Sequence, residues 1–307
     1  MNESILITGA NIGLGKETAR QLALKKETKK VILFCRNQAK AEAAKKDLEE
    51  KTGKKIFEIV IGDVSDENSV RKAVEKIKEP IDAIILNAGG MVGKTAGKIT
   101  PSGMNEIAAT NILGHVILVE ELIKHGKLKK TVLLASSEAI PGVKMLGMKP
   151  VAMKTSSVDE FAAVLDGSYF GNKFDMMQAY GYVKYVATMW MFSMARKYPN
   201  LKFVAMSPGN TGGTGAPDSI PQPMKFMLTY FMMPIVMPLM GVVHKVEVGA
   251  KRFVDGISDE RYKTGIFYAS KERKLTGEVV DQSTFFADLK NSTFQDNAHK
   301  AIHRFIK

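Results

Sequence analysis

Short apolar runs alternate with longer amphipathic stretches along most of this chain. The runs have the length of β-strands and are mostly continuous in Ile, Val and Leu, as expected for a parallel sheet with both faces covered. Between them apolar residues recur at helical spacing, as where Ala19, Leu22 and Ala23 share one face. The pattern predicts strands at residues 4–8, 31–35, 56–61, 81–86, 131–135, 201–206 and 265–268. This alternation favours an α/β fold with one Rossmann-like, doubly wound parallel sheet of about seven strands and helices on both faces.

No repeat, low-complexity block or linker-like shift in composition divides the chain, so we expect a single domain over residues 1–307. Three parts should lie outside the sheet and its helices, namely an insertion, a lid and a C-terminal extension at residues 138–178, 207–245 and 269–307. The insertion is far longer than the usual loop of about 2–6 residues. Within it, Ser157 followed by Glu160 is a capping-box pattern that predicts a short helix.

The segment 226–243 has 18 residues and no charge, which is the lower limit for spanning a bilayer. Pro234 and Pro238 would interrupt a helix there. We do not expect a span, because both ends must return to the same sheet, but shallow contact with a membrane surface stays open. The first apolar run, residues 5–7, is too short for a signal-peptide core, so we expect a cytoplasmic protein, with a peripheral position at a membrane as the alternative.

Composition narrows the classes of function. With 45% hydrophobic and 25% charged residues the chain is an ordinary globular protein, which excludes disordered, collagen-like and coiled-coil proteins. The single cysteine, Cys35, excludes an internal disulfide and a cysteine-based metal centre. The formal charge of +12 comes from lysines on predicted helix faces and loops, without the interleaved aromatic residues of a nucleic-acid groove. We therefore expect no nucleic-acid partner and interpret the excess charge as solvated surface that favours an anionic cofactor.

The first predicted strand leads into a glycine-rich turn and then a helix. Glycine at positions 9, 13 and 15 allows a tight turn, close approach of the backbone to a pyrophosphate, and close packing of helix on strand. The helix N-terminus adds free N–H groups that favour phosphate. The turn therefore predicts a dinucleotide site. The residues expected to contact the dinucleotide here are Gly9, Asn11, Ile12, Gly13, Leu14 and Gly15.

The end of the second predicted strand bears on which dinucleotide is bound. It carries Arg36 and no carboxylate. Proteins that use NAD place an acidic residue at this point for the ribose hydroxyls. A carboxylate would repel a 2′-phosphate, whereas a guanidinium binds one well. The sequence favours NADP(H) over NAD.

Tyr180 and Lys184 are four residues apart in a helical pattern and therefore share one face. A tyrosine with a pKa near ~10 is a poor acid–base group at neutral pH. A cation within ~4–6 Å would lower that pKa. Tyr182 and Tyr185 lack a lysine four residues later, so we expect the acid–base pair at Tyr180 and Lys184.

The TGxxxGxG spacing of the glycine turn resembles the short-chain dehydrogenase/reductase family, and especially its branch of retinol dehydrogenases, carbonyl reductases and light-dependent protochlorophyllide reductases. Further segments match that family's motifs in order along nearly the whole chain. They are Asp63-Val64, Asn87-Ala88-Gly89, Asn111 to His115, Ser136-Ser137, the Tyr180/Lys184 pair, and Pro208-Gly209 with Thr214. The resemblance implies cofactor contacts at Asp63, Val64, Asn87, Ala88, Gly89, Tyr180, Lys184, Pro208, Gly209 and Thr214.

The same resemblance implies a catalytic tetrad of Asn111, Ser137, Tyr180 and Lys184. In these roles the Ser137 hydroxyl donates to the substrate carbonyl oxygen, and Tyr180 exchanges a proton with it while hydride moves to or from the nicotinamide. Lys184 would bind the nicotinamide ribose, and Asn111 would help hold a water that links the lysine to solvent. Ser136 stays open as an alternative, because Ile140 replaces the glycine that usually sets the register.

The chain also departs from the family pattern. The gap between Ser137 and Tyr180 is longer than usual. A similar insertion in some carbonyl reductases covers the helix face that others use for tetramers, so we expect a monomer or small homo-oligomer. The functional cysteines of protochlorophyllide reductases are missing, so that activity ranks low.

Of the 18 methionines, 15 lie between residues 145 and 240, the half expected to form the substrate pocket. Flexible thioethers suit an adaptable apolar cavity, so the predicted substrate is a small lipophilic carbonyl or alcohol. His299 and His303 have the spacing of a metal pair, but no carboxylate or third ligand accompanies them in the sequence. We therefore expect an exposed tail helix there and no metal site. The alternatives to an oxidoreductase are a non-catalytic dinucleotide sensor and a membrane-surface binding protein on the same fold.

Overall fold

The computed structural model describes residues 2–144, 147–172, 174–212 and 242–307. Thr214 and most of the apolar segment 226–243 lie outside these residues, as does most of the expected lid. Within the described part, no helix combines the length and apolar character needed to cross a bilayer.

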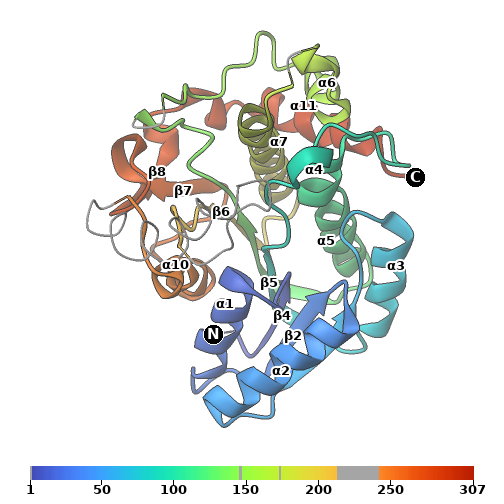
Figure 1. Cartoon of the computed structure of the whole chain (residues 1–307), viewed down its shortest axis with the longest axis vertical. Coiled ribbons are helices and arrows are strands. Elements are labelled where there is room, and N and C mark those ends of the chain that lie inside the picture. The colour runs from blue at the N-terminus through green and yellow to red at the C-terminus, as the bar shows by residue number, and fades with distance from the viewer. Residues whose placement is uncertain (1, 145–146, 173, 213–241) are drawn as a thin grey trace, which may run out of the picture.

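The centre of the molecule is an eight-stranded sheet in the order β3-β2-β1-β4-β5-β6-β7-β8 (Figure 1). All neighbouring strands are parallel except β7 and β8. The strands are β1 Ser4–Thr8, β2 Lys30–Cys35, β3 Phe57–Ile61, β4 Ile81–Leu86, β5 Leu128–Ala135, β6 Lys202–Met206, β7 Ile266–Ser270 and β8 Val279–Asp281. The predicted doubly wound parallel sheet is confirmed. The antiparallel edge strand β8 was not predicted, because three half-buried residues leave no periodic signal.

Helices cover both faces of the sheet, and each face has its own apolar core. One face carries α1 Gly13–Ala23, α2 Gln38–Thr52 and α10 Val246–Ser258. The other carries α3 Glu67–Lys76, α5 Gly114–Lys124 and α7 Met176–Lys197. The remaining helices of the described part are α4 Glu106–Ala108, α6 Val158–Asp166, α11 Ser292–His303, the π-helix Ala109–Leu113, and the 3₁₀ turns Gly93–Thr95, Ser168–Phe170, Lys271–Arg273, Gln282–Thr284 and Ala287–Lys290.

The short helix predicted in the insertion is confirmed as α6, with one half of its capping box. Ser157 is the N-cap of α6, and its hydroxyl accepts a hydrogen bond from the Glu160 N–H at 3.1 Å. The Glu160 carboxylate accepts from the N–H of Ser156, the residue before the N-cap, at 2.8 Å, whereas the Ser157 N–H donates to the Thr155 hydroxyl. The Ser157 hydroxyl thus satisfies one of the N–H groups that the first helical turn leaves free.

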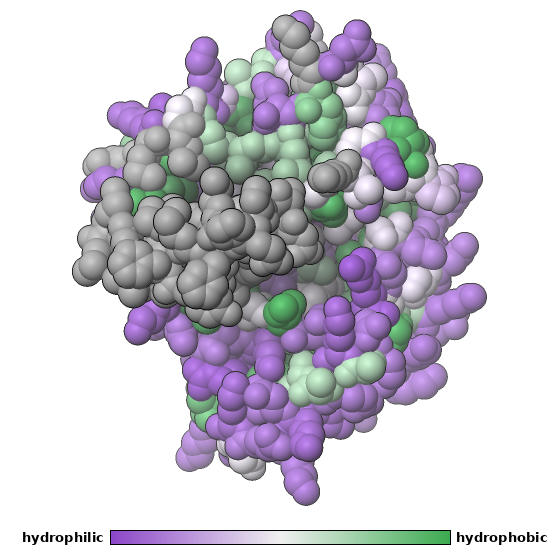
Figure 2. Space-filling view, in the orientation of Figure 1, coloured by the Kyte–Doolittle hydropathy of each residue, from purple (hydrophilic) through white to green (hydrophobic). Residues whose placement is uncertain are grey.

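The surface at the α1–α2 end of the molecule is largely hydrophilic (Figure 2). The Lys46 side chain on α2, for example, is 81% exposed. Its partner Glu50 lies one helical turn away at 4.0 Å, a pair that contributes only about 0.3–0.5 kcal/mol. Such solvated lysines agree with our interpretation of the excess positive charge.

The C-terminal helix α11 corrects one expectation. It packs against α6 and α7 and is not an exposed tail. His303 on α11 also meets a carboxylate, because its Nε2 lies 2.9 Å from Oε2 of Glu120 on α5. The expectation that no carboxylate accompanies the histidine pair was wrong, since the contact joins residues 183 positions apart in the chain.

Candidate active site

A cavity of about 600 Å³ opens at the carboxyl ends of the parallel strands. It lies where the strand order reverses between β1 and β4, the place at which open α/β sheets bind ligands. The predicted residues that line it are Gly9, Asn11, Ile12, Gly13, Leu14, Arg36, Asp63, Val64, Asn87, Ala88, Gly89, Tyr180, Lys184 and Pro208. Ser136, the open alternative to Ser137, also lines it, together with residues that the motifs did not include, namely Phe34, Cys35, Gly62, Ser65, Gly90, Val92, Glu106, Thr110 and Ala135. Gly15, Asn111, Ser137 and Gly209 are not among the lining residues, and Thr214 is outside the described residues.

The glycine turn has a backbone conformation that residues other than glycine adopt poorly. Gly9 and Gly13 have φ of 67° and 56°, in the left-handed region. A Cβ on Gly15 would lie 2.4 Å from the Gly9 carbonyl oxygen, so α1 can pack this closely only on glycine. The N-cap Ile12 makes no side-chain cap. The first N–H groups of α1 are therefore free to bind an anion at the cavity.

The ends of β1 and β4 are joined by the Thr8 hydroxyl. Its oxygen accepts hydrogen bonds from the backbone N–H groups of Asn87 and Ala88, both at 2.9 Å. The Asn87 side-chain amide donates to the Thr8 carbonyl at 2.9 Å. These bonds hold the β4 loop against the glycine turn, so the two walls of the cavity form one unit.

Asn111 lies in the short π-helix and supports the β4 loop from behind. Its Nδ2 donates to the carbonyls of Gly90 at 2.9 Å and Ile107 at 2.8 Å, and its Oδ1 accepts from the Gly90 N–H at 2.9 Å. A Cβ on Gly89 would lie 2.4 Å from that Oδ1. The side chain thus shapes the loop, and its role in holding a water stays a prediction.

Arg36 stands at the exposed rim of the cavity, directly after β2. It makes no ion pair or hydrogen bond with any other described residue, so its guanidinium is available to a ligand. Asp63, which follows β3, already has hydrogen-bond partners within the protein. Its Oδ1 accepts from the Ser65 N–H and hydroxyl at 2.9 and 2.7 Å.

Tyr180 and Lys184 lie side by side on α7, as their spacing predicts. The Lys184 ammonium is 5.6 Å from the centre of the Tyr180 ring and donates to the Ala135 carbonyl at 2.9 Å. The expected lowering of the tyrosine pKa was wrong. Burial raises the pKa of Tyr180 to about 12, although the hydrogen bond with Ser137 opposes this. Burial also lowers the pKa of Lys184 to about 8, because the charged form of each group is poorly solvated here.

The two serines after β5 have different partners. The Ser136 side chain is 3% exposed, and its hydroxyl pairs with that of Thr188 at 2.9 Å. The Ser137 hydroxyl instead bonds with the Tyr180 phenol and accepts from the Ala139 N–H at 3.1 Å. Ser137 thus lies beside the Tyr180 phenol whereas Ser136 lines the cavity, so the choice between the two serines stays a prediction.

Residues 3–146, which hold the glycine turn, the β4 loop and both serines, match the family model described as short chain dehydrogenase. The chain is thus similar to the short-chain dehydrogenase/reductase family, over residues 3–146 by the family model and over longer stretches by the relatives below. Members of this family are nicotinamide-dependent oxidoreductases.

Similar family members cover different shares of the chain. Bovine dehydrogenase/reductase SDR family member 12 is 29% identical over 220 residues, which are 71% of this chain and 63% of the bovine one. Human dehydrogenase/reductase SDR family member 12 is 38% identical over 120 residues, or 38% of this chain and 37% of its own. The matches thus span less than two thirds of these relatives. Cucumber chloroplastic protochlorophyllide reductase is 28% identical over 304 residues, covering 91% of this chain and 74% of its own.

Solved structures show the same fold. The L-sorbose reductase of Gluconobacter frateurii, solved with NADPH and L-sorbose, superposes with a TM-score of 0.63 at 18% identity, covering 90% of this chain and 97% of its own. At this identity the likeness concerns the fold alone.

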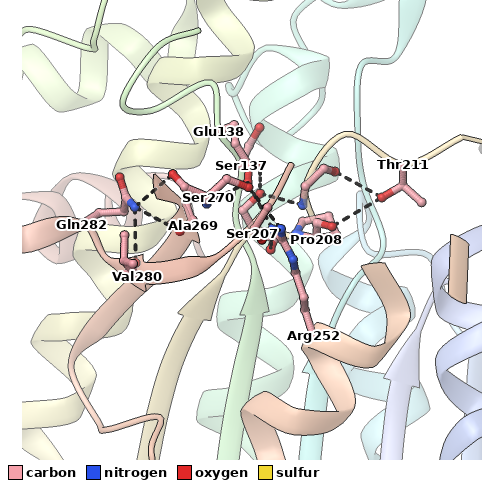
Figure 3. Close-up of polar contacts among 12 residues, drawn as sticks. Ser137, Glu138, Ser207, Pro208, Thr211, Arg252, Ala269, Ser270, Val280 and Gln282 are labelled. Atoms are coloured by element: carbon pink, nitrogen blue, oxygen red, sulfur yellow. Dashed lines mark hydrogen bonds and ion pairs between the residues drawn. The ribbon is translucent and has the colours of Figure 1, made fainter. Parts of the chain in front are cut away.

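Behind the short-chain dehydrogenase site lies a buried ion pair that the sequence did not reveal (Figure 3). Glu138 directly follows Ser137, and its Oε1 lies 3.3 Å from Nη1 of Arg252 on α10. Both side chains are nearly inaccessible, at 6% and 7% exposure. Burial raises the pKa of Glu138, although Arg252 opposes the shift. In the sequence, Arg252 is a single charged residue on an otherwise apolar face of α10. This pattern indicates a buried charge but not which residue pairs with it.

This pair joins the ends of three strands. Glu138 accepts from Ser270 on β7, through its N–H at 3.2 Å and its hydroxyl at 2.9 Å, and also from the Ser207 hydroxyl. Arg252 donates to the Ser207 carbonyl at 3.2 Å (Figure 3). Ser207 in turn accepts from the Gly209 N–H at 3.2 Å. The network thus holds the Pro208-Gly209 turn beside the serine that contacts Tyr180.

Proposed function

We propose that the chain is an NADP(H)-dependent oxidoreductase that transfers a hydride between the nicotinamide and a small lipophilic carbonyl or alcohol. One observation carries the proposal: the glycine turn, Arg36, Tyr180 and Lys184 all border a single cavity at the switch point of the sheet. A cradle for phosphate and an acid–base pair are thereby combined in one site.

The residues present fit a dinucleotide. The wall of the cavity is bare backbone at Gly9, and a Cβ there would come within 3.0 Å of Ala88 Cα. The glycine turn and the α1 N-terminus would hold the pyrophosphate, and Asp63 and Val64 would border the adenine. Tyr180, Lys184 and the Pro208-Gly209 turn would border the nicotinamide ribose. When bound, the cofactor supplies or accepts the hydride.

Preference for the phosphorylated cofactor rests on Arg36. Its guanidinium is exposed at the cavity rim and has no competing carboxylate partner among the described residues. An arginine can bind a phosphate through two parallel hydrogen bonds. Hydrogen bonds to charged groups contribute about 1.5–3 kcal/mol.

The chain's own groups act on the substrate oxygen. With a pKa of about 12, Tyr180 holds its proton at neutral pH and is poised to donate it in the direction of reduction. The Ser137 hydroxyl would donate a second hydrogen bond to the same oxygen. Lys184 stays charged below its pKa of about 8 and favours the phenolate that proton transfer leaves behind.

A second cavity supports a lipophilic substrate. It has about 470 Å³ and lies between the insertion and the start of α7. Ala139 and Gly181, the close neighbours of Ser137 and Tyr180 in the chain, line it together with Met148, Val151 and Met177. Lys149, Asp175 and Gln178 also line it, whereas Tyr180 and Lys184 line the first cavity. An apolar substrate could be held with its oxygen toward Tyr180.

The decisive assay follows NADPH absorbance against a panel of hydrophobic aldehydes and ketones, with NADH in parallel. Tyr180→Phe should abolish turnover and leave NADPH binding nearly intact. Tyr198→Phe is the matched control, because Tyr198 is the C-cap residue of the same helix α7 and lines neither cavity. Full activity of Tyr180→Phe would refute the assignment. NADPH binding without turnover of any carbonyl or alcohol would favour the dinucleotide sensor.

Two further variants test the finer assignments. Arg36→Ala should lower kcat/KM for NADPH by about 10–100-fold and leave that for NADH unchanged. Ser137→Ala should lower kcat far more than Ser136→Ala. An equal loss with both nucleotides would contradict the role of Arg36, and the opposite order of the serine variants would move the role to Ser136.

A further inference from the structure

A second cluster of functional side chains lies away from the cavity, where α11 packs near α5 and α7. Its members are Glu120 on α5 and the pair His299 and His303 on α11. One ligand atom from each lies within 4.8 Å of the other two. The two imidazole rings are stacked, with centres 4.2 Å apart.

His303 has an acceptor at each ring nitrogen. Nδ1 lies 2.8 Å from the His299 carbonyl oxygen, and Nε2 lies 2.9 Å from Glu120 Oε2. A neutral imidazole has one N–H and can donate to only one of them. If Nδ1 donates to the carbonyl, Nε2 turns a lone pair toward a carboxylate. A cation must then stand between the two, either as a proton on the ring or as a metal ion.

Two buried atoms of the cluster indicate whether this cation is a proton or a metal ion. Nδ1 of His299 and Oε1 of Glu120 are buried and make no hydrogen bond of ordinary geometry with a described residue, although the Trp190 side chain lies near enough to Glu120 to help lower its pKa. A proton on His303 satisfies the contact with Oε2 but leaves Nδ1 of His299 without a partner. Buried polar atoms without partners are uncommon and costly. A metal ion could bind both imidazoles and the carboxylate together.

We infer that Glu120, His299 and His303 form a binding site for one Zn²⁺ ion. Two imidazoles and one carboxylate, with a fourth position left to water, are a ligand set that zinc accepts. Hard ions such as Mg²⁺ prefer oxygen ligands and are not expected to bind. Tetrahedral bonds of about 2.0–2.2 Å place ligand atoms about 3.4 Å apart, so small side-chain rotations would close the site.

A contact that would orient one ligand is already present, because Nδ1 of His303 lies 2.8 Å from the His299 carbonyl oxygen. An Nδ1–H donated to this carbonyl would leave Nε2 for the metal and fix the histidine in one tautomer, as in known metal sites. The side chains of His303 and Glu120 remain 33% and 27% exposed, which leaves a path for the ion. A bound ion would tie the C-terminal helix to α5, beside the helix that carries Tyr180.

The test titrates the full-length chain, freed of metal, with Zn²⁺ by calorimetry. We expect one ion per chain, a rise in Tm that EDTA reverses, and no response to Mg²⁺. Glu120→Gln, His299→Ala and His303→Ala should each weaken Zn²⁺ binding at least about 10-fold. His125→Ala is the matched control. His125 is the C-cap residue of α5 and lies 3.3 Å from Glu121, and no second histidine joins this pair among the described residues.

A measurement on the unaltered chain avoids variants that fold poorly. Zinc should shift the imidazole NMR signals of two of the five histidines, and these should be the two lost in His299→Ala and His303→Ala. Tight binding that survives all three substitutions, or a titration in which no imidazole signal moves, would overturn the site.

Discussion

Replacing Lys184 by methionine should stabilise the protein at pH 7 while it removes activity. Lys184 is 2% exposed, and among the described residues its ammonium has one hydrogen-bond acceptor, the Ala135 carbonyl. Burial lowers its pKa to about 8 from an ordinary value of 10.5. This difference of about 2.5 corresponds to about 3 kcal/mol of unfolding free energy. Methionine has a similar length and no charge, so it avoids that cost.

The net gain is smaller, because methionine leaves the Ala135 carbonyl without its donor, at a cost of about 1 kcal/mol. We therefore expect Lys184→Met to be about 2 kcal/mol more stable than the unaltered protein at pH 7. The sign of the pH dependence follows from proton binding. Between pH 8 and 10.5 the unfolded chain holds the lysine proton and the folded one does not, so the stability of the unaltered protein rises with pH in this window.

The assay is urea unfolding of both proteins at matched pH values from 7 to 10.5, so that all other titrations cancel. The advantage of Lys184→Met should shrink by about 1.36 kcal/mol per pH unit above pH 8 and then reverse. For Lys46→Met, at an exposed position on α2, the free energy of unfolding should change with pH in the same way as that of the unaltered protein. A stability difference that stays constant across this range would refute the reasoning, as would a variant that is less stable at pH 7.

Three further outcomes follow from the site. Glu138→Gln should lower stability by about 3–5 kcal/mol in urea unfolding, because it leaves the Arg252 charge buried and unpaired, and adding Arg252→Met should recover part of the loss. Gly15→Ala should weaken NADPH binding, measured by fluorescence titration, since its Cβ would lie 2.4 Å from the Gly9 carbonyl oxygen; unchanged affinity would argue against this packing. In the oxidation direction Tyr180 must act as a base, and with a pKa of about 12 its ionised fraction rises about tenfold per pH unit. The rate of alcohol oxidation should therefore climb between pH 6 and 8 while that of carbonyl reduction stays nearly flat, and equal pH profiles would contradict this role.

Most of the fold was predictable from the sequence because its signals are local. Continuous apolar runs mark strands covered on both faces, and the prediction at residues 81–86 coincides with β4 Ile81–Leu86. The four-residue spacing of Tyr180 and Lys184 places them together on α7 whatever packs around them. The capping box at Ser157 and Glu160 acts within one helical turn.

The features that could not be predicted depend on contacts between distant parts of the chain. Glu138 and Arg252 are 114 positions apart, and the folded sheet alone brings them together. Glu120 meets His303 across 183 positions, which is why the histidine pair lacks a carboxylate in the sequence and has one in the structure. Spacing along a helix carries no information about such partners.

The sequence by itself determined the strand–helix order, the glycine turn and the pairing of Tyr180 with Lys184, since each follows from periodicity or steric limits within a few residues. Only the tertiary structure decided the protonation of that pair. Proximity suggested that the lysine would lower the tyrosine pKa, but burial raises it to about 12 and lowers that of Lys184 to about 8. The cost of removing a charge from water depends on everything packed around it, and that packing exists only in the folded chain.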